Sequence, residues 1–280
     1  MKAPQPAAAK AAMSALLALL VCVPVVTAAL DTTGWKQARL TRVIKDVTVL
    51  APPATSRKAV LNDSVPEGGA IRTGVSSRTE VTFASRSVAR LGANTFVRLK
   101  TGTLGTRDLQ LEDGAVLFDI APGARATNIK TAGITAEIAG TTGMIERFGR
   151  AYVKILILQG EARVYLSRVG ESVLIGPGKL LITKPEAKIL PEAVDYEIGQ
   201  LYKTSLLTNS DFAPLPSRNA ILAQIRKQES DPNFIRTNLV IYGRGTLVNL
   251  VPTTETAAPS TRGSASVTPA PSPSKRGPKR

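Results

Sequence analysis

The stretch that decides the fold runs from Ala70 to Leu99 and reads AIRTGVSSRTEVTFASRSVARLGANTFVRL. Apolar residues alternate with polar ones in Glu80-Val81-Thr82-Phe83 and again in Val97-Arg98-Leu99. A period of two predicts β-strands that turn one face to a core and the other to water. Gly, Ser and Asn interrupt the pattern, so the stretch predicts a series of short strands with turns at Gly74–Ser77, Ala84–Ser85 and Gly92–Asn94.

The β pattern continues to about residue 185, with turn residues every 8–12 positions. Residues 109–118, 156–165 and 173–182 share a design of strand, glycine turn and second strand, and we expect each to be a hairpin. Residues 154–158 are apolar on both faces, which predicts a central strand buried on both sides. We therefore expect a mainly β domain, built as a sandwich or a short solenoid-like roll of hairpins.

Several of these segments resemble, in the family's order, the extracytoplasmic FecR domain, named for the ferric-citrate regulator. The resemblance spans roughly residues 40–182. It rests on Arg72-Thr73-Gly74, Ser77-Arg78, Arg90-Leu91-Gly92-Ala93-Asn94, 109–118, 129–143 and 156–164. It implies a β-fold with a surface for protein contact. If Gly92 has a positive φ angle at its turn, Gly92→Val should destabilise the fold by about 1–3 kcal/mol.

Full FecR-type regulators relay the occupancy of an outer-membrane receptor to a cytoplasmic σ factor. Only ten residues precede the hydrophobic segment here, too few for an anti-σ domain. The resemblance therefore implies a stand-alone exported version without the σ relay.

An export signal is indicated at the N-terminus. Lys2 and Lys10 flank an uncharged run at 11–26, and Thr27-Ala28-Ala29 offers a cleavage site. The run has 16 residues, against the roughly 20 that span a bilayer, and an uncleaved membrane anchor is the alternative. We expect residues 1–29 to be a signal peptide and the protein to be periplasmic or extracellular. The only cysteine, Cys22, lies inside this segment, so the mature chain would hold no disulfide.

The remaining chain divides into three parts by pattern. Residues 30–185 form the FecR-like all-β domain, and 186–250 form an α/β appendix with helical spacing at 191–202, a helix capped by Ser217 and a hairpin at 238–248. Residues 251–280 are rich in Pro, Ser, Thr and Ala and contain five basic residues. We expect this last segment to be a disordered basic tail, because it has almost nothing to bury.

The side-chain inventory argues against an enzyme. The chain has no histidine, which excludes Ser-His-Asp hydrolysis and the common His-containing metal sites. Carboxylates are the remaining acid–base candidates, and a glycosidase would need two of them about 5–10 Å apart. The candidates are Asp113, Asp119, Glu146 and Glu161, of which Asp113 and Glu161 read as turn residues beside glycines. We expect no catalytic residues, no cofactor and no metal site, and the sequence names no binding residues.

The formal charge of +15 raises the question of which anionic partner the protein binds. Export argues against nucleic acid, and no basic run with interleaved aromatics occurs in the β region. The leading hypothesis is a non-catalytic envelope module for sensing or protein interaction. The alternative is a cell-wall or polysaccharide-binding protein, whose basic surface and tail would attract anionic polymers or lipid headgroups. Retention that falls with salt would favour the alternative.

Overall fold

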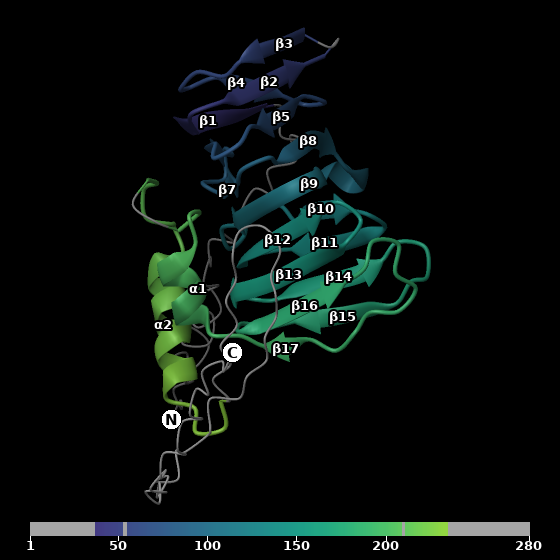
Figure 1. The fold of residues 1–280 in the computed structure, drawn as a ribbon, viewed down its shortest axis with the longest axis vertical. Coiled ribbons are helices and arrows are strands. Elements are labelled where there is room, and N and C mark those ends of the chain that lie inside the picture. Colours follow the sequence, from purple (N-terminus) through teal and green to yellow (C-terminus); the bar gives the residue numbers. More distant parts are fainter. Residues whose placement is uncertain (1–36, 53–54, 209–210, 235–280) are drawn as a thin grey trace, which may run out of the picture.

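The computed structural model describes residues 37–52, 55–208 and 211–234 (Figure 1). The predicted signal peptide, the hairpin at 238–248 and the basic tail lie outside these residues. The elements are β1 (Gln37–Ile44), β2 (Val47–Ala51), β3 (Thr55–Lys58), β4 (Ser64–Pro66), β5 (Ala70–Thr73), β6 (Arg78–Thr82), β7 (Val88–Leu91), β8 (Phe96–Thr101), a 3-10 turn (Thr103–Gly105), β9 (Arg107–Asp119), β10 (Thr127–Thr131), β11 (Ile134–Ile138), β12 (Thr142–Phe148), β13 (Tyr152–Gln159), β14 (Ala162–Leu166), β15 (Ser172–Ile175), β16 (Lys179–Thr183), β17 (Val194–Asp195), α1 (Ile198–Thr204) and α2 (Arg218–Glu229). The prediction of a mainly β chain with a small helical appendix is confirmed.

The 17 strands form one connected open sheet that folds into two layers. Layer A has the order β4-β1-β6-β7-β9-β12-β13-β16-β17. Layer B has the order β3-β2-β5-β8-β9-β10-β11-β14-β15. The long strand β9 belongs to both layers, because its first half pairs with β8 and β10 and its second half pairs with β7 and β12.

The main core lies between the two layers. Side chains at every second position of each strand meet there, as the alternation predicts. Layer A contributes Leu40, Val81, Val116, Phe118, Ile145 and Ile155, and layer B contributes Val49, Ile71, Val97, Leu111, Ile129 and Val164. Burial of these apolar side chains is the main favourable term in folding.

The three segments predicted as hairpins are not hairpins. Residues 109–118 lie within the single strand β9, which bends at Gly114 where it passes from layer B to layer A. The segment 156–165 crosses from β13 in layer A to β14 in layer B at Gly160, and 173–182 crosses from β15 to β16 at Gly178. These three glycines have φ between +74° and +91°, a backbone conformation that takes the chain out of its layer. A hairpin and a crossing between layers share the same sequence pattern of a strand, a glycine and a second strand. The pattern alone therefore wrongly predicted hairpins.

A second apolar cluster covers the outer face of layer A. Val88, Leu117, Met144, Leu156, Leu158 and Leu180 point outward from the strands and pack against Tyr196, Ile198, Leu201, Leu207, Phe212, Leu215 and Ile221. The helices therefore lie against layer A alone (Figure 1). This packing confirms the prediction that residues 154–158 form a strand buried on both faces.

The appendix was predicted in part. Helical spacing was expected from residue 191, but β17 pairs with β16 first and α1 begins only at Ile198. The second helix begins at Arg218, one residue after the predicted cap Ser217. The Ser217 hydroxyl makes no capping bond, because it donates to the carboxylate of Asp119 in β9 at 2.8 Å. That carboxylate also accepts the backbone N–H of Ser217 at 2.9 Å, which ties the start of α2 to layer A.

Candidate functional site

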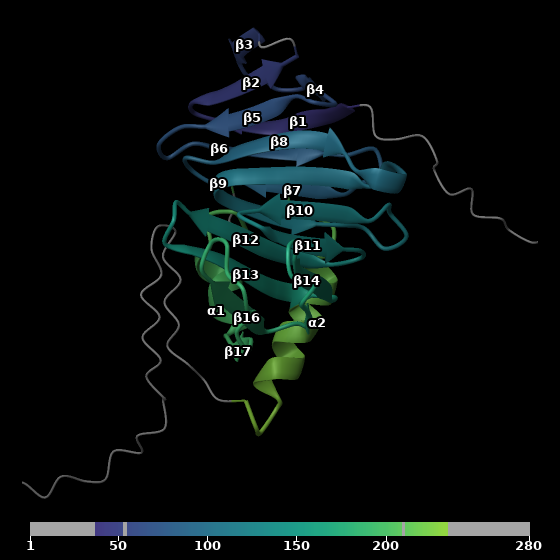
Figure 2. The same cartoon turned by 90° about the vertical axis from the view of Figure 1, so that its right-hand side faces the viewer.

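Neither described helix covers the outer face of layer B, because both pack against layer A. Figure 2 looks onto the strands of layer B, with α1 and α2 on the far side of the molecule. Side chains facing outward from this layer, which we call the open face, are Arg72, Phe96, Arg98, Lys100, Asp108, Gln110, Glu112, Asn128, Lys130, Thr135, Glu137, Arg163, Tyr165, Ser172 and Leu174.

Strand register arranges most of the open face in two rows across six strands. One row runs Arg98, Gln110, Lys130, Thr135, Tyr165 and Ser172, in which each residue is paired directly with the next. The parallel row runs Lys100, Asp108, Asn128, Glu137, Arg163 and Leu174. Cross-strand neighbours lie within reach of one another, so the rows form continuous polar bands.

Polar contacts hold several of these side chains in place. The Lys130 amine lies 2.6 Å from a carboxylate oxygen of Asp108. The guanidinium groups of Arg72 and Arg98 lie over the ring of Phe96, at 4.9 and 5.4 Å from its centroid. Arginine and aromatic side chains are enriched where proteins bind one another, and the open face presents both.

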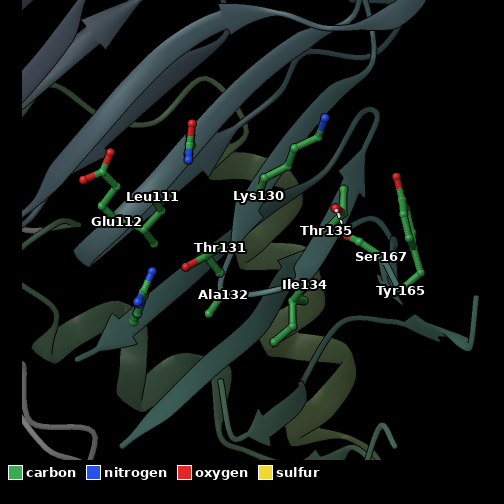
Figure 3. A pocket seen from close by; sticks show the side chains of 12 residues that line it. Leu111, Glu112, Lys130, Thr131, Ala132, Ile134, Thr135, Tyr165 and Ser167 are labelled. Atoms are coloured by element: carbon green, nitrogen blue, oxygen red, sulfur yellow. Dashed lines mark hydrogen bonds between the residues drawn. The ribbon is translucent and has the colours of Figure 1, made fainter. Parts of the chain in front are cut away.

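A hollow of about 410 Å³ lies in the open face where β9 leaves layer B (Figure 3). The pairing of β10 with β9 ends at Lys130 and Gln110, and the pairing of β12 begins at Arg147 and Gly114. Residues 111–113 of β9 therefore have no strand beside them on this side, and we call this gap the notch. Its lining residues are Gln110, Leu111, Glu112, Lys130, Thr131, Ala132, Gly133, Ile134, Thr135, Arg147, Tyr165 and Ser167.

Three motifs of the FecR resemblance, Arg72-Thr73-Gly74, Ser77-Arg78 and Arg90-Leu91-Gly92-Ala93-Asn94, build arches, the turns in which the chain passes from a strand of one layer to a strand of the other. The hydroxyl of Thr73 donates to the carbonyl of Gly92 at 2.6 Å and accepts the backbone N–H of Thr95 at 2.8 Å. The N–H of Asn94 donates to the carbonyl of Gly74 at 3.0 Å. Each arch is thus bonded to the next one along the edge of the sheet. These three motifs hold the fold together, whereas the later segments 109–118 and 129–143 supply most of the notch lining.

The positive φ on which the prediction for Gly92 depends is not present. Gly92 is not among the residues with positive φ, and the left-handed position of that arch is taken by Asn94, at φ 49°. Asparagine tolerates this region because its short amide bonds locally. A Cβ at Gly92 would lie 3.5 Å from the Cβ of Ala115, an ordinary contact. The demanding glycine is Gly114, with φ +91°, where an added Cβ would collide with Thr95.

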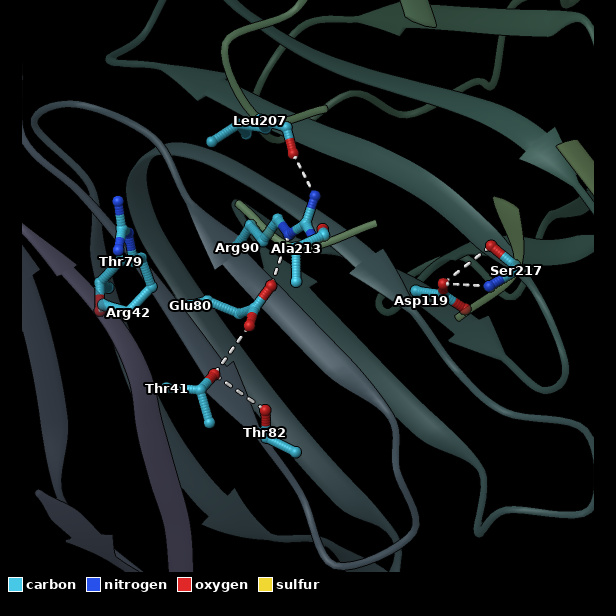
Figure 4. A network of polar contacts seen from close by, with 10 residues as sticks. All are labelled: Thr41, Arg42, Thr79, Glu80, Thr82, Arg90, Asp119, Leu207, Ala213 and Ser217. Carbon is cyan, nitrogen blue, oxygen red and sulfur yellow. Dashed lines mark hydrogen bonds and ion pairs between the residues drawn. The ribbon is translucent and has the colours of Figure 1, made fainter. Parts of the chain in front are cut away.

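Arg90, another signature residue, is buried rather than exposed. The alternation placed Glu80 on the solvent side of its strand, yet its residue is 8% exposed and Arg90 is 1% exposed. Arg90 donates to the Glu80 carboxylate at 2.7 Å and to the carbonyls of Leu207 and Ala213 at 2.8 and 2.5 Å (Figure 4). The appendix covers this part of layer A, which the alternation alone did not reveal.

The four carboxylates considered for acid–base chemistry serve different structural contacts. Asp113 accepts the N–H of Gly149 at 3.0 Å, and Asp119 holds Ser217. These two residues are six positions apart on β9, which corresponds to about 20 Å along a strand. Glu146 forms a buried ion pair with Lys154, and Glu161 is exposed in the arch after Gly160. Asp113 and Asp119 therefore lie too far apart to form the carboxylate pair that a glycosidase needs.

Two buried groups have shifted pKa values for structural reasons. Burial, and then the charge of Arg125, lowers the pKa of Arg107 to about 10. The guanidinium of Arg107 lies 4.1 Å from the ring centroid of Phe83. Burial raises the pKa of Tyr196 well above its ordinary value, and its hydroxyl donates to the carbonyl of Ile157 at 2.7 Å. Both groups lie outside the open face.

The sequence predicted none of the open-face residues to bind a partner, although Arg72, Gln110 and Lys130 belong to segments that carry the FecR resemblance. Their period-two spacing places them opposite the core, but it does not say which outer face the appendix leaves free. The unpaired segment of β9 had no sequence signal, because it follows from the neighbours that each half of β9 finds.

Comparison with known proteins agrees with the resemblance. Residues 69–163 match the family model described as FecR protein, and no curated protein matches. Two crystal structures of a "putative anti-sigma factor" from Parabacteroides distasonis ATCC 8503 are similar, each with a TM-score of 0.42. The first, at 15% identity, covers 49% of this chain and 64% of its own. The second, at 17% identity, covers 64% and 82%.

Among the described residues, neither helix is long and apolar enough to cross a membrane. The matched region extends from the start of β5 into β14, and it includes most of the notch lining and most of the open face. FecR domains belong to regulatory proteins rather than to an enzyme family. Over residues 69–163 the chain is therefore similar to the FecR protein family.

Proposed function

We propose that this protein is an exported, non-catalytic module that senses or binds another protein in the cell envelope through the open face of its FecR domain. The observation that carries the proposal is the difference between the two layers. The outer face of layer A is apolar and packed beneath the appendix, whereas the described part of the chain leaves the outer face of layer B uncovered.

The chemistry of the open face suits a protein partner. Side chains already fixed by neighbours, such as Lys130 by Asp108 and Phe96 by two arginines, lose little freedom on binding. The mixture of both charges gives specificity rather than general attraction to polyanions. This favours a protein over an anionic polymer as the principal partner.

The exported, stand-alone form is part of the same proposal. It is supported by the charged flank, apolar run and small-residue site of residues 1–29. Mass spectrometry of the protein from the envelope fraction should find an N-terminus at Ala29 or Leu30. A retained Met1 in the membrane fraction would instead show an anchored form.

Site-specific photocrosslinking in intact cells tests the interaction surface. A photoreactive residue would replace Lys100, Glu137 or Arg163 on the open face, or Lys203 or Arg218 on the exposed side of the helices as controls. We expect a discrete protein adduct from the open-face positions only. Adducts from the helical positions alone would contradict the proposal, and retention on purified cell wall without any protein adduct would favour the polymer-binding alternative.

A further inference from the structure

The notch differs from the rest of the open face because a short stretch of strand there lacks a neighbouring strand on one side. In layer B a strand at this place normally has a neighbour on each side, yet residues 111–113 have only β8. Peptide N–H and C=O groups are strong, obligatory hydrogen-bonding groups. A free stretch of strand is therefore a ready template for one more extended segment.

An unsatisfied hydroxyl lies in the wall of the notch. Thr131 is 5% exposed, and its Oγ1 has no hydrogen-bond partner among the described residues. Figure 3 shows this hydroxyl on the side of Thr131 that faces Leu111. A buried hydroxyl without a partner costs free energy, and a ligand group in the notch would supply the missing bond.

The third feature is a cation without a carboxylate partner. Arg147 lines the notch from the end of β12, and its Nε donates only to the carbonyl of Gly149, at 3.3 Å. The other charged lining residues are engaged, Lys130 with Asp108 at 2.6 Å and Glu112 with Arg98 at 3.6 Å. The guanidinium of Arg147 is thus the group in the lining that is suited to bind an incoming carboxylate.

We infer that the notch binds an extended peptide segment of a partner protein, with an acidic side chain that pairs with Arg147. The segment would lie beside residues 111–113 as an added strand and bond to the Thr131 hydroxyl. The inference rests on the proposed function and names the site and the kind of segment that it takes. The hollow of about 410 Å³ falls within the range of roughly 300–1,000 Å³ typical of ligand pockets.

A saccharide fits the notch less well than a peptide. Oligosaccharide sites stack sugar rings on aromatic side chains, and the only aromatic residue in the lining is Tyr165. The free edge of β9 matches the repeat of a peptide backbone, which a sugar does not reproduce.

The test is a titration of the isotope-labelled protein, followed by nuclear magnetic resonance, with the blocked pentapeptide acetyl-Thr-Val-Asp-Val-Thr-amide. Two matched peptides carry Asn in place of Asp, or an N-methyl group on the central amide. We expect shifts confined to residues 110–113, 131–135 and 147. Each altered peptide should bind about tenfold more weakly, the change expected for one charge-assisted or one backbone hydrogen bond.

Protein variants separate binding from folding. Arg147→Gln should weaken the Asp peptide about tenfold and leave the Asn peptide unchanged, whereas Arg150→Gln, at the exposed turn three residues away, should change neither. Thr131→Val should weaken the peptide several-fold and leave the melting temperature equal or higher, because the variant removes an unsatisfied hydroxyl.

Equal affinity of the Asp and Asn peptides, or shifts outside the notch, would overturn the inference, as would the absence of binding at millimolar peptide. So would a chito-oligosaccharide that shifts the same residues when the peptide does not. If open-face crosslinks still capture a protein while the peptide fails, the proposed function stands and the notch is not its site. If the peptide binds and no crosslink forms, the notch binds peptides but the proposed function fails.

Discussion

Replacement of Arg90 by methionine tests how the appendix is fastened to the β domain. Methionine keeps most of the aliphatic length but removes the guanidinium. The variant therefore loses the ion pair to Glu80, two bonds to the carbonyls of Leu207 and Ala213, and the contact with the ring of Phe212 at 4.7 Å. The Glu80 carboxylate would keep one donor, the hydroxyl of Thr41 at 2.8 Å, and stay buried.

The expected loss follows from burial. Removal of one partner of a buried ion pair costs about 3–5 kcal/mol, because the other charge is left without compensation. At roughly 2–4 °C per kcal/mol for a domain of this size, the melting temperature should fall by about 6–20 °C. The double variant Arg90→Met with Glu80→Gln should recover part of this loss, because no uncompensated charge remains.

Thermal unfolding and urea denaturation followed by circular dichroism would measure the change. The matched control is Arg98→Met, because Arg98 pairs with Glu112 at 3.6 Å with side chains 37% and 43% exposed. An exposed pair contributes about 0–1 kcal/mol, so the control should unfold nearly as the parent does. Equal, small effects of both variants would refute the view that Arg90 fastens the appendix.

Three further outcomes are expected. Gly114→Ala should destabilise the fold by at least about 2 kcal/mol, through strain at φ +91° and collision with Thr95. Gly92→Ala should cost under about 1 kcal/mol. Similar urea midpoints for the two variants would contradict this account of the two glycines. Asp119→Ala should cost about 1–3 kcal/mol by removing the acceptor for Ser217 and speed proteolysis in α2; unchanged cleavage would argue against this tie. Because burial raises the pKa of Tyr196, its contribution to the free energy of unfolding is complete below the ordinary value of 10.0 and is lost as the pH rises above that value. Tyr196→Phe should flatten this decline of the unfolding free energy with pH. An equally steep decline in the variant would contradict the prediction.

Much of the β domain could be predicted from the sequence because strand alternation and turn residues are local signals. The turns at Gly74–Ser77 and Gly92–Asn94 and the burial of Val81 and Val97 are all confirmed. The connections could not be predicted in the same way. Gly160 and Gly178 turn the chain into the opposite layer rather than back along its own, and that choice depends on strands far away in the sequence.

The candidate site could not be predicted from the sequence for the same reason. Glu80 and Arg98 both occupy polar positions of alternating strands, but Glu80 is buried under the appendix and Arg98 lies on the open face. The difference comes from the packing of residues 196–221 against layer A alone. The notch depends in turn on the bend of β9 at Gly114, which separates the partners of its two halves.

Charge reversal with a matched control tests the role of the open face most directly. One variant carries Arg72→Glu, Lys100→Glu and Arg163→Glu on the open face, and the other carries Lys203→Glu, Arg218→Glu and Lys227→Glu on the helices. Both have the same net charge, so general attraction to anionic envelope material falls equally. Quantitative recovery of crosslinked partner from cells should be lost in the open-face variant and kept in the helical one. Equal recovery from both variants, or a loss confined to the helical one, would contradict the assignment of the open face as the interaction surface.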